Sequence, residues 1–161
     1  MMKCLLVMAL FGALALTCSA YSRGAPQGAC DTMEPLGHSG ARRNPAPNPY
    51  SLSAPSKANP SDTITVELSG ADFKGYMIQA VTPKGQVVGT FTTSGLSCNP
   101  QTQARDTATH SSSNVVRNIT VQWVAPPDAA GIVYFRGTVV QDYSNYYTNI
   151  YSNPVSFGPA E

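Results

Sequence analysis

The chain has 161 residues, with 10 Lys and Arg against 9 Asp and Glu, which gives a formal net charge of +1. Its longest cationic cluster is the pair Arg42-Arg43. Proteins that bind nucleic acid or attack anionic membranes use a basic patch or stripe, so this charge balance argues against both classes. Recognition by this chain is therefore expected to depend on shape, hydrogen bonds and aromatic contact.

The first twenty residues, MMKCLLVMALFGALALTCSA, combine an early lysine, an apolar run and a small-residue end. These are the three regions of a secretory signal peptide, and they predict cleavage after Ala20. The alternative is an uncleaved membrane anchor, which is disfavoured because the run is short for a hydrocarbon core that needs about 20 residues. Cleavage leaves 141 of the 161 residues, starting at Tyr21, and removal of Lys3 brings the net charge to 0. No second apolar run of spanning length follows, so we expect no membrane span and a soluble, secreted, extracellular protein.

Cleavage also removes Cys4 and Cys18 and leaves Cys30 and Cys98. An oxidising compartment leaves one intramolecular pairing for these two cysteines. Two free thiols or an intermolecular bridge are the alternatives. A structural zinc site needs four ligands, so two isolated cysteines do not predict a metal, and no cofactor is expected.

Residues 21–161 have the length of a single domain, and their first part, residues 21–61, is rich in turn formers. Proline removes backbone donors, which excludes continuous helix and central strand from this part. We expect residues 21–61 to form an extended arm over the surface, tied down by Cys30. The prolines that support this are Pro45, Pro47, Pro49, Pro55 and Pro60.

From residue 62 onward the apolar residues alternate with polar ones. TITVELS places Ile64, Val66 and Leu68 on one face, as in a half-buried strand. GYMIQAV and QVVGTFTT follow as strands, with TPKG between them as a hairpin turn. After a polar stretch over residues 99–113, strand patterns return in NVVRNITVQWVA, GIVYFRGTVV and NPVSF. Short strands with Gly and Pro punctuation predict that residues 62–158 form an antiparallel β-sandwich of immunoglobulin-like kind.

The strand NVVRNITVQWVA contains a glycosylation signal. Its alternation places Ile119, Val121 and Trp123 on one face and Asn118 on the other. The sequon Asn118-Ile119-Thr120 therefore presents its asparagine to solvent and predicts N-glycosylation. Trp123 is expected in the core between the sheets rather than in a ligand-stacking site.

The strand GIVYFRGTVV is followed by a tyrosine-rich segment. Alternation assigns Val133, Phe135 and Val139 to the core and Tyr134, Arg136 and Thr138 to the opposite face. The segment QDYSNYYTNIYSN then predicts a long polar loop. Tyrosine with serine and asparagine is typical of adaptable recognition loops, although the same rings can cap the end of a sandwich. The candidate ligand-binding residues are Tyr143, Tyr146, Tyr147, Tyr151 and Arg136, with Tyr143 and Tyr151 the expected exposed members.

Patterns for catalysis are absent from the sequence. The two histidines, His38 and His110, lie in different irregular segments without H-x-H or H-x-x-x-H spacing, and His110 is expected to be a solvated loop residue. There is no G-x-S-x-G elbow, C-x-x-C pair or glycine-rich phosphate loop. The sequence therefore predicts a protein that is not an enzyme.

Several motifs in one order resemble the reeler domain, over nearly the whole of residues 21–161. They are CDTMEP, NPY, FKGYMIQA, the cysteine after GTFTTSGLS, ATHSSS, VQWVAP and GIVYFRGTVV. A stand-alone domain of this kind behind a signal peptide resembles the small secreted defense proteins of insects. The resemblance implies an immunoglobulin-like sandwich and a Cys30–Cys98 disulfide. An aromatic pair is usual at the position of Tyr146 and Tyr147, which implies that at least one of them is structural.

The resemblance also implies a function. It implies a role in innate immunity, through binding of microbial surface glycans or lipids and with antimicrobial activity, although the neutral charge disfavours direct membrane lysis. Reeler domains also begin larger proteins such as reelin, so the alternative is an extracellular interaction module in adhesion or signalling.

Overall fold

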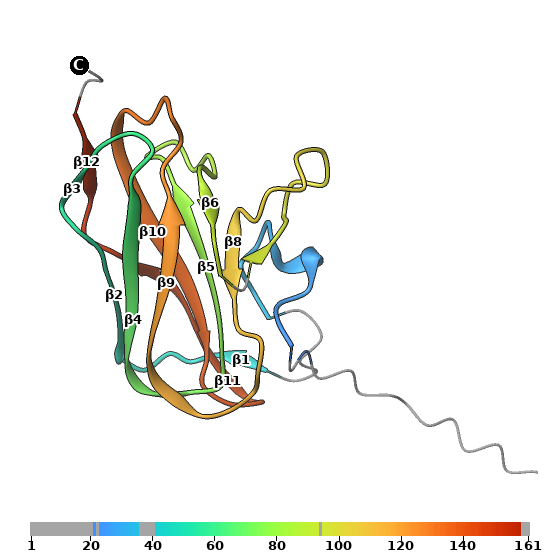
Figure 1. Ribbon diagram of the computed structural model, residues 1–161. Coiled ribbons are helices and arrows are strands. Elements are labelled where there is room, and N and C mark those ends of the chain that lie inside the picture. The colour runs from blue at the N-terminus through green and yellow to red at the C-terminus, as the bar shows by residue number, and fades with distance from the viewer. Residues whose placement is uncertain (1–20, 22, 36–40, 94, 159–161) are drawn as a thin grey trace, which may run out of the picture.

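The computed structural model describes residues 21, 23–35, 41–93 and 95–158. Within these residues the chain forms two β-sheets packed face to face, with a 3-10 turn, η1 (Gln27–Ala29), as the one helical element (Figure 1). The predicted all-β sandwich is confirmed. The signal-peptide prediction concerns residues 1–20, which lie outside the described residues.

The smaller sheet of the described chain has four strands in the order β2 (Tyr50–Ser53), β4 (Thr63–Phe73), β9 (Val116–Val124) and β6 (Thr90–Phe91). The larger sheet follows the order β1 (Arg42–Arg43), β11 (Asn145–Tyr151), β10 (Gly131–Val140), β5 (Gly75–Val81), β8 (Thr107–Thr109) and β7 (Gly95–Leu96). Strand β12 (Val155–Phe157) pairs with the start of β10 and with β3 (Lys57–Ala58).

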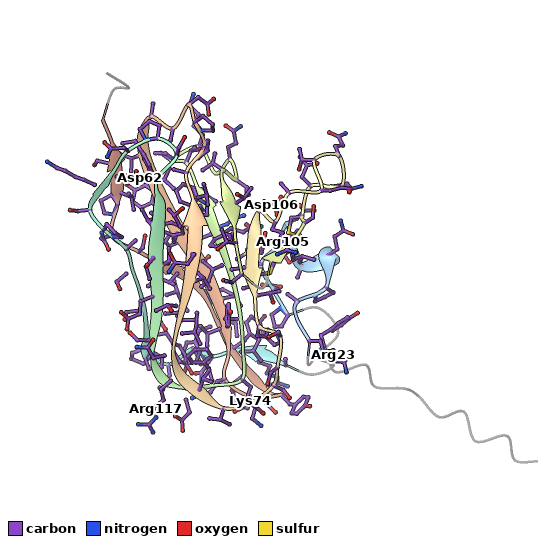
Figure 2. The ribbon with its side chains drawn as sticks, in the orientation of Figure 1. Arg23, Asp62, Lys74, Arg105, Asp106 and Arg117 are labelled. Carbon is purple, nitrogen blue, oxygen red and sulfur yellow. A yellow bond between two sulfur atoms is a disulfide. The ribbon has the colours of Figure 1, made fainter. Side chains whose placement is uncertain are left out.

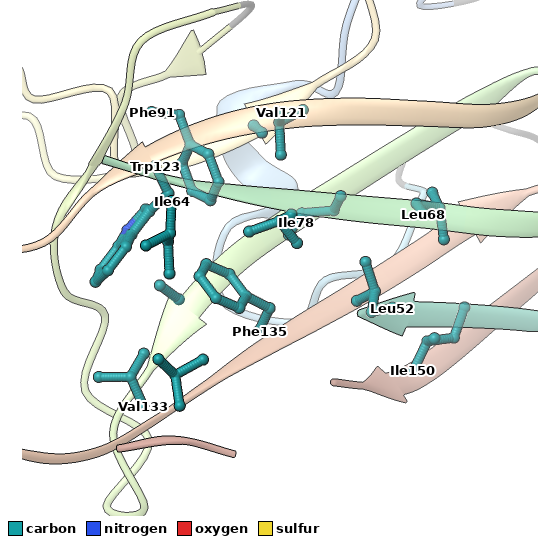
Figure 3. Packing of buried hydrophobic residues seen from close by; sticks show 14 of the residues in the cluster. Leu52, Ile64, Leu68, Ile78, Phe91, Val121, Trp123, Val133, Phe135 and Ile150 are labelled. Atoms are coloured by element: carbon teal, nitrogen blue, oxygen red, sulfur yellow. The ribbon is translucent and has the colours of Figure 1, made fainter. Parts of the chain in front are cut away.

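The core lies between the sheets, and the predicted alternation selects its residues. Ile64, Val66 and Leu68 of β4 face the core, and Val133, Phe135 and Val139 of β10 oppose them from the larger sheet. Trp123 is fully buried, with its ring edge-on to Phe135 at 5.4 Å between centroids (Figure 3). Its indole N–H donates to the Val88 carbonyl at 3.1 Å, which satisfies its polar group. The prediction for Trp123 is confirmed.

The hairpin predicted after β5 is confirmed at its turn and over the short antiparallel pairing of Val87 and Val88 with the end of β5. The Thr82 N–H donates to the Gln86 carbonyl, and Gly85 has φ +80. The chain then crosses to the other sheet, where β6 pairs with β9. Gly89 makes this crossing with φ +68, and a Cβ there would lie 2.3 Å from the Trp123 ring. QVVGTFTT is therefore not one strand, because it bends over the indole.

Part of the predicted arm belongs to the sandwich. Residues Tyr50–Ser53 form β2, with Tyr50 and Leu52 buried and antiparallel to β4. β2 is the first strand of its sheet, and Pro49 stands just before it. Proline is tolerated at this edge position, although it excludes a central strand. Strands of both sheets therefore precede residue 62, since β1 belongs to the larger sheet and β2 to the smaller one.

Residues 23–35 of the arm cover the outer face of the larger sheet at β5, next to β8 (Figure 1). The Cys30–Cys98 disulfide joins it to the loop before β8, as predicted, with 5.5 Å between the Cα atoms. Met33 packs on Met77 of β5. The Thr138 hydroxyl donates to the Met33 carbonyl at 2.6 Å. The face of β10 opposite the core is therefore buried at Thr138, because a second layer lies on it.

Candidate functional site

The tyrosine-rich segment is a strand and not a loop. β11 pairs antiparallel with β10 and parallel with β1. The pairing shifts between Gly137 and Val139, where Thr138 opposes two residues of β11, and Asn149 has φ +59. This β-bulge breaks the alternation of side chains, which is why a period of two did not reveal the strand.

Tyr147 belongs to the core. It is 6% exposed, and its ring lies edge-on to that of Tyr50 at 5.3 Å between centroids. The Tyr50 hydroxyl donates to the Asp72 carbonyl at 2.9 Å. Burial first, and then the charges of Tyr147, Asp142 and Asp72, raise the pKa of Tyr50 to about 12. That at least one of Tyr146 and Tyr147 is structural is thereby confirmed.

Tyr143 lies apart, in the turn between β10 and β11. It is 57% exposed, and Lys74 Nζ lies 5.8 Å from the centroid of its ring. Figure 2 shows Lys74 at the end of the sandwich where this turn lies. Asp142 organises the turn by accepting the N–H groups of Ser144 and Asn145, each at 2.8 Å.

The environment of Asp142 acts on its acidity in two directions. Partial burial raises the pKa of the carboxyl group, but hydrogen bonds from Ser144 and Asn145 and the nearby Lys74 charge outweigh this. The pKa of Asp142 therefore lies below its ordinary value. The turn is built to hold a carboxylate, so Tyr143 is presented by a defined support.

Tyr151 and Arg136 are cross-strand neighbours. They pair directly in the register of β10 and β11, and Tyr151 is 53% exposed. The half-buried Arg136 guanidinium donates through Nε (3.1 Å) and one terminal nitrogen (2.7 Å) to the Gln79 amide oxygen. No ion pair of Arg136 occurs within the described part of the chain, because the one salt bridge found there joins Arg117 and Asp72.

Arg136 lines a polar groove of about 400 Å³ beside the disulfide, here named the disulfide groove. Asp31, Asn99 and Asp106 also line it, together with the buried Gln79. The Asp106 carboxylate accepts the backbone N–H groups of Cys98 (2.8 Å) and Asn99 (3.0 Å) and so fixes the loop around the disulfide. Figure 2 shows Asp106 on the side of the sandwich that carries the arm.

Tyr146 is half-buried and pairs with Arg43 of β1. Beside this pair runs a second groove, of about 380 Å³, between β11 and residues 43–48; it is here named the arm groove. Arg43, Asn44 and Thr148 line it, and none of them was a candidate from the sequence. The one available signal was the Arg42-Arg43 pair, because the contact between segments a hundred residues apart leaves no local pattern.

The five candidate residues therefore do not form one surface. Arg136 and Tyr151 lie together, and Tyr147 lies in the core and borders the arm groove. Tyr146 pairs with Arg43 of β1, and Tyr143 lies apart in the turn. The predicted exposure of Tyr143 and Tyr151 is confirmed.

His110 is held by the protein and is not a solvated loop residue. Its Nδ1 accepts the Tyr76 N–H at 3.3 Å, and its Nε2 lies 3.0 Å from the Tyr21 carbonyl. The neutral imidazole with the proton on Nε2 satisfies both contacts. His38 lies outside the described residues. In the described ranges no three side chains of His, Cys, Asp or Glu gather to hold a metal ion, and no helix has the length and apolarity to cross a bilayer.

Asn118 lies on the outer face of the smaller sheet and is exposed. Its side-chain amide donates to Glu67 of the neighbouring strand. The sequon asparagine therefore points to solvent, as the alternation predicted, and glycosylation there stays a prediction.

Comparison with known proteins gives three consistent results. A family model described as the Reeler domain matches residues 28–161. The defense protein l(2)34Fc of Drosophila melanogaster is 37% identical over 144 residues, which cover 84% of this chain and 87% of that protein. The human F-spondin reeler domain has a similar structure, with a TM-score of 0.57 at 21% identity, covering 74% of this chain and 95% of that domain. At this identity the structural likeness concerns the fold alone.

A fourth match is to a longer protein, of which a small part is similar to this chain. A Drosophila melanogaster protein named as a candidate ferric-chelate reductase 1 homolog is 32% identical over 148 residues. The match covers 83% of this chain but 22% of that protein. The similarity is therefore confined to a small part of the reductase homolog.

Proposed function

This chain belongs to the reeler-domain family, and on that premise we propose that it is a secreted defense protein that binds microbial surface glycoconjugates and catalyses no reaction. The defense role is supported by l(2)34Fc, because the match spans most of both chains. The non-enzymatic role is supported by the small share of the reductase homolog that is matched. Binding without membrane lysis agrees with a charge of +1 over the whole chain.

One observation carries the binding proposal: the exposed Tyr151 ring lies directly across from Arg136, which lines the disulfide groove. An aromatic ring offers a large contact area with two rotatable angles, so it costs little entropy to order. The groove adds amide, carboxylate and guanidinium groups that can hydrogen-bond to sugar hydroxyls. Its volume falls in the range of small-molecule sites, about 300–1,000 Å³.

The test is sedimentation of the purified chain from residue 21 with intact bacteria and with insoluble cell-wall polymers. We expect saturable binding that soluble wall fragments compete away. Tyr151→Ala is expected to weaken it about tenfold, as for a central aromatic contact. Tyr143→Ala is the matched control, because the two tyrosines are 53% and 57% exposed but only Tyr151 adjoins Arg136.

Two results would overturn the proposal. Equal weakening by both substitutions would remove the assignment to Tyr151. A wild-type chain that stays in the supernatant with every microbe would remove microbial binding itself and favour a host partner in adhesion or signalling. Bacterial survival, measured in the same samples, shows whether binding also kills.

Secretion is tested separately, by mass spectrometry of the protein recovered from the medium of expressing cells. We expect the chain to begin at Tyr21. A start at any other position, or retention in the cells, would contradict the predicted cleavage after Ala20.

A further inference from the structure

The arm groove has a lining that is selective in chemistry. It is bounded by residues 43–48 on one side and by Tyr147 and Thr148 of β11 on the other. Its volume of about 380 Å³ lies within the range of small-molecule sites. No carboxylate lines the groove, whereas a guanidinium, a hydroxyl and a phenol do. The disulfide groove differs, because Asp31 and Asp106 line it.

The polar groups of the arm groove are mainly unused donors. Arg43 is exposed and forms no ion pair with any described residue. Asn44 accepts the Ala46 N–H at 2.9 Å through its amide oxygen, which leaves its two amide N–H donors. Thr148 has no side-chain hydrogen bond within the described ranges. Such a lining favours a ligand that carries acceptors and negative charge.

Asn48 also lines the arm groove, but unlike Asn44 its side chain is hydrogen-bonded through both its oxygen and its nitrogen. Its amide oxygen accepts the Tyr50 N–H at 3.0 Å, and its amide nitrogen donates to the Tyr50 carbonyl at 3.1 Å. Both ends of this side chain are therefore occupied in holding β2 in place. Asn48 is a structural part of the groove wall, and the ligand contacts fall to the other residues.

Tyr147 supplies the second observation. It lines the groove, is 6% exposed, and its hydroxyl has no hydrogen-bond partner in the described part of the chain. Its neighbour Tyr50 is equally buried, but the Tyr50 hydroxyl is bonded to a carbonyl. A buried hydroxyl without a partner costs about 1–3 kcal/mol, and buried polar groups in folded proteins are nearly always hydrogen-bonded, so a ligand in the groove would supply the partner that the protein does not.

We infer that the arm groove binds an acidic sugar unit, with Arg43 on its carboxylate and Tyr147, Thr148 and Asn44 donating to its oxygens. Pro45 supplies an apolar wall against which the carbon side of a sugar ring packs. The inference rests on the proposed function, since it names the class of glycoconjugate unit that the protein takes. It adds a site separate from Tyr151 and Arg136.

The test measures binding of two monosaccharides to the chain from residue 21 by chemical-shift perturbation. N-Acetylmuramic acid and N-acetylglucosamine share the ring and acetamide, and only the first carries a lactyl carboxylate. We expect the acid to bind at least about tenfold more tightly, as charge-assisted hydrogen bonds are stronger than neutral ones. Arg43→Gln should abolish this preference. Arg42→Gln is the matched control, because Arg42 is the neighbouring exposed arginine of β1 and does not line the groove.

A second pair of variants separates binding from folding. Tyr147→Phe keeps the packed ring and removes the unpartnered hydroxyl, so we expect weaker binding of the acid at unchanged or higher thermal stability. Tyr50→Phe removes a bonded hydroxyl, so we expect lower stability at unchanged binding.

The inference is wrong if the two sugars bind equally, or if Arg43→Gln and Arg42→Gln behave alike. Sedimentation with bacteria in the absence of any preference for the acid would overturn the inference and leave the proposed function standing. Preferential binding of the acid by a chain that sediments with no microbe would overturn the proposed function and leave the acid-binding groove standing.

Discussion

The strands of both sheets alternate between core and outer side chains, but the two outer faces differ in their exposure to solvent. On the smaller sheet, Thr65, Asn118 and Thr120 are exposed. On the larger sheet, Met77, Gln79 and Thr138 occupy equivalent positions, but all three are buried beneath the arm. The composition of a strand therefore tells which side faces the core, while the burial of its other side depends on a segment that lies far away in the sequence.

The largest expected effect comes from releasing the covered face. Replacing both cysteines, Cys30→Ser with Cys98→Ser, removes a bond that closes 68 residues of sequence separation. The entropic model for a loop of this length predicts a loss of about 4 kcal/mol in the free energy of unfolding. Denaturant unfolding measures it, and hydrogen exchange should show faster exchange in residues 23–35. A loss below about 1 kcal/mol would mean that the contact of Met33 with Met77 holds the arm by itself.

Particular strands show which parts of the fold can be predicted from the sequence. Strands β4, β9 and β10 were predicted because each contains a run of alternating core and outer side chains, and Trp123 because it lies in the run of β9. β11 was missed because the bulge at Asn149 places both Tyr147 and Ile150 in the core. β2 was missed because its four residues follow a proline-rich run.

The candidate sites were less accessible to sequence than the fold. The pairing of Arg136 with Tyr151 depends on the register of two strands, and the arm groove joins Arg43 to Thr148. Tyrosine composition indicated the segment that contains Tyr151, yet it did not show which rings lie in the core, in the turn and on the surface. That distribution follows from tertiary contacts, which local patterns do not record.

The second prediction concerns the place where the two sheets each contribute a tyrosine. The pKa of Tyr50 is raised to about 12 in the folded protein, against about 10 in an unfolded chain. The folded state therefore holds this proton more tightly, so its contribution to stability is complete below pH 10 and is lost as the pH rises from 10 to 12. The complete loss corresponds to about 3 kcal/mol, of which about 2 kcal/mol falls between pH 9 and pH 11.5. Unfolding free energies at about pH 9 and pH 11.5 should show this step in the wild type.

Tyr50→Phe is the control for that step. The variant lacks the phenolic proton, so its unfolding free energy should fall less between the two pH values. An equal fall in both proteins would assign the alkaline sensitivity to other tyrosines.

The third prediction compares one substitution on both faces. Thr138→Val removes the hydroxyl that donates to the Met33 carbonyl beneath the arm, and the isosteric side chain leaves that carbonyl unsatisfied. The expected cost is about 1–2 kcal/mol. Thr65→Val removes a hydroxyl that bonds to Gln122 on the open face, where water replaces it, so the expected change is below about 0.5 kcal/mol. Thermal unfolding of the two variants measures the difference, and equal costs would show that the arm does not exclude water from Thr138.

The smallest effect is expected at the sequon of the open face. Asn118 is exposed and its side chain bonds only to Glu67, so an attached glycan would extend from the face without displacing a packed residue. We expect protein from a secreting eukaryotic host to carry a glycan that Asn118→Gln or Thr120→Ala removes, as shown by the mass of the intact chain. The free energy of unfolding should change by less than about 0.5 kcal/mol, because neither residue has a buried contact to lose. Loss of folding on glycan removal would mean that the glycan covers the open face in the glycosylated protein, as the arm covers the outer face of the larger sheet. The two faces would then differ in having a carbohydrate cover and a peptide cover.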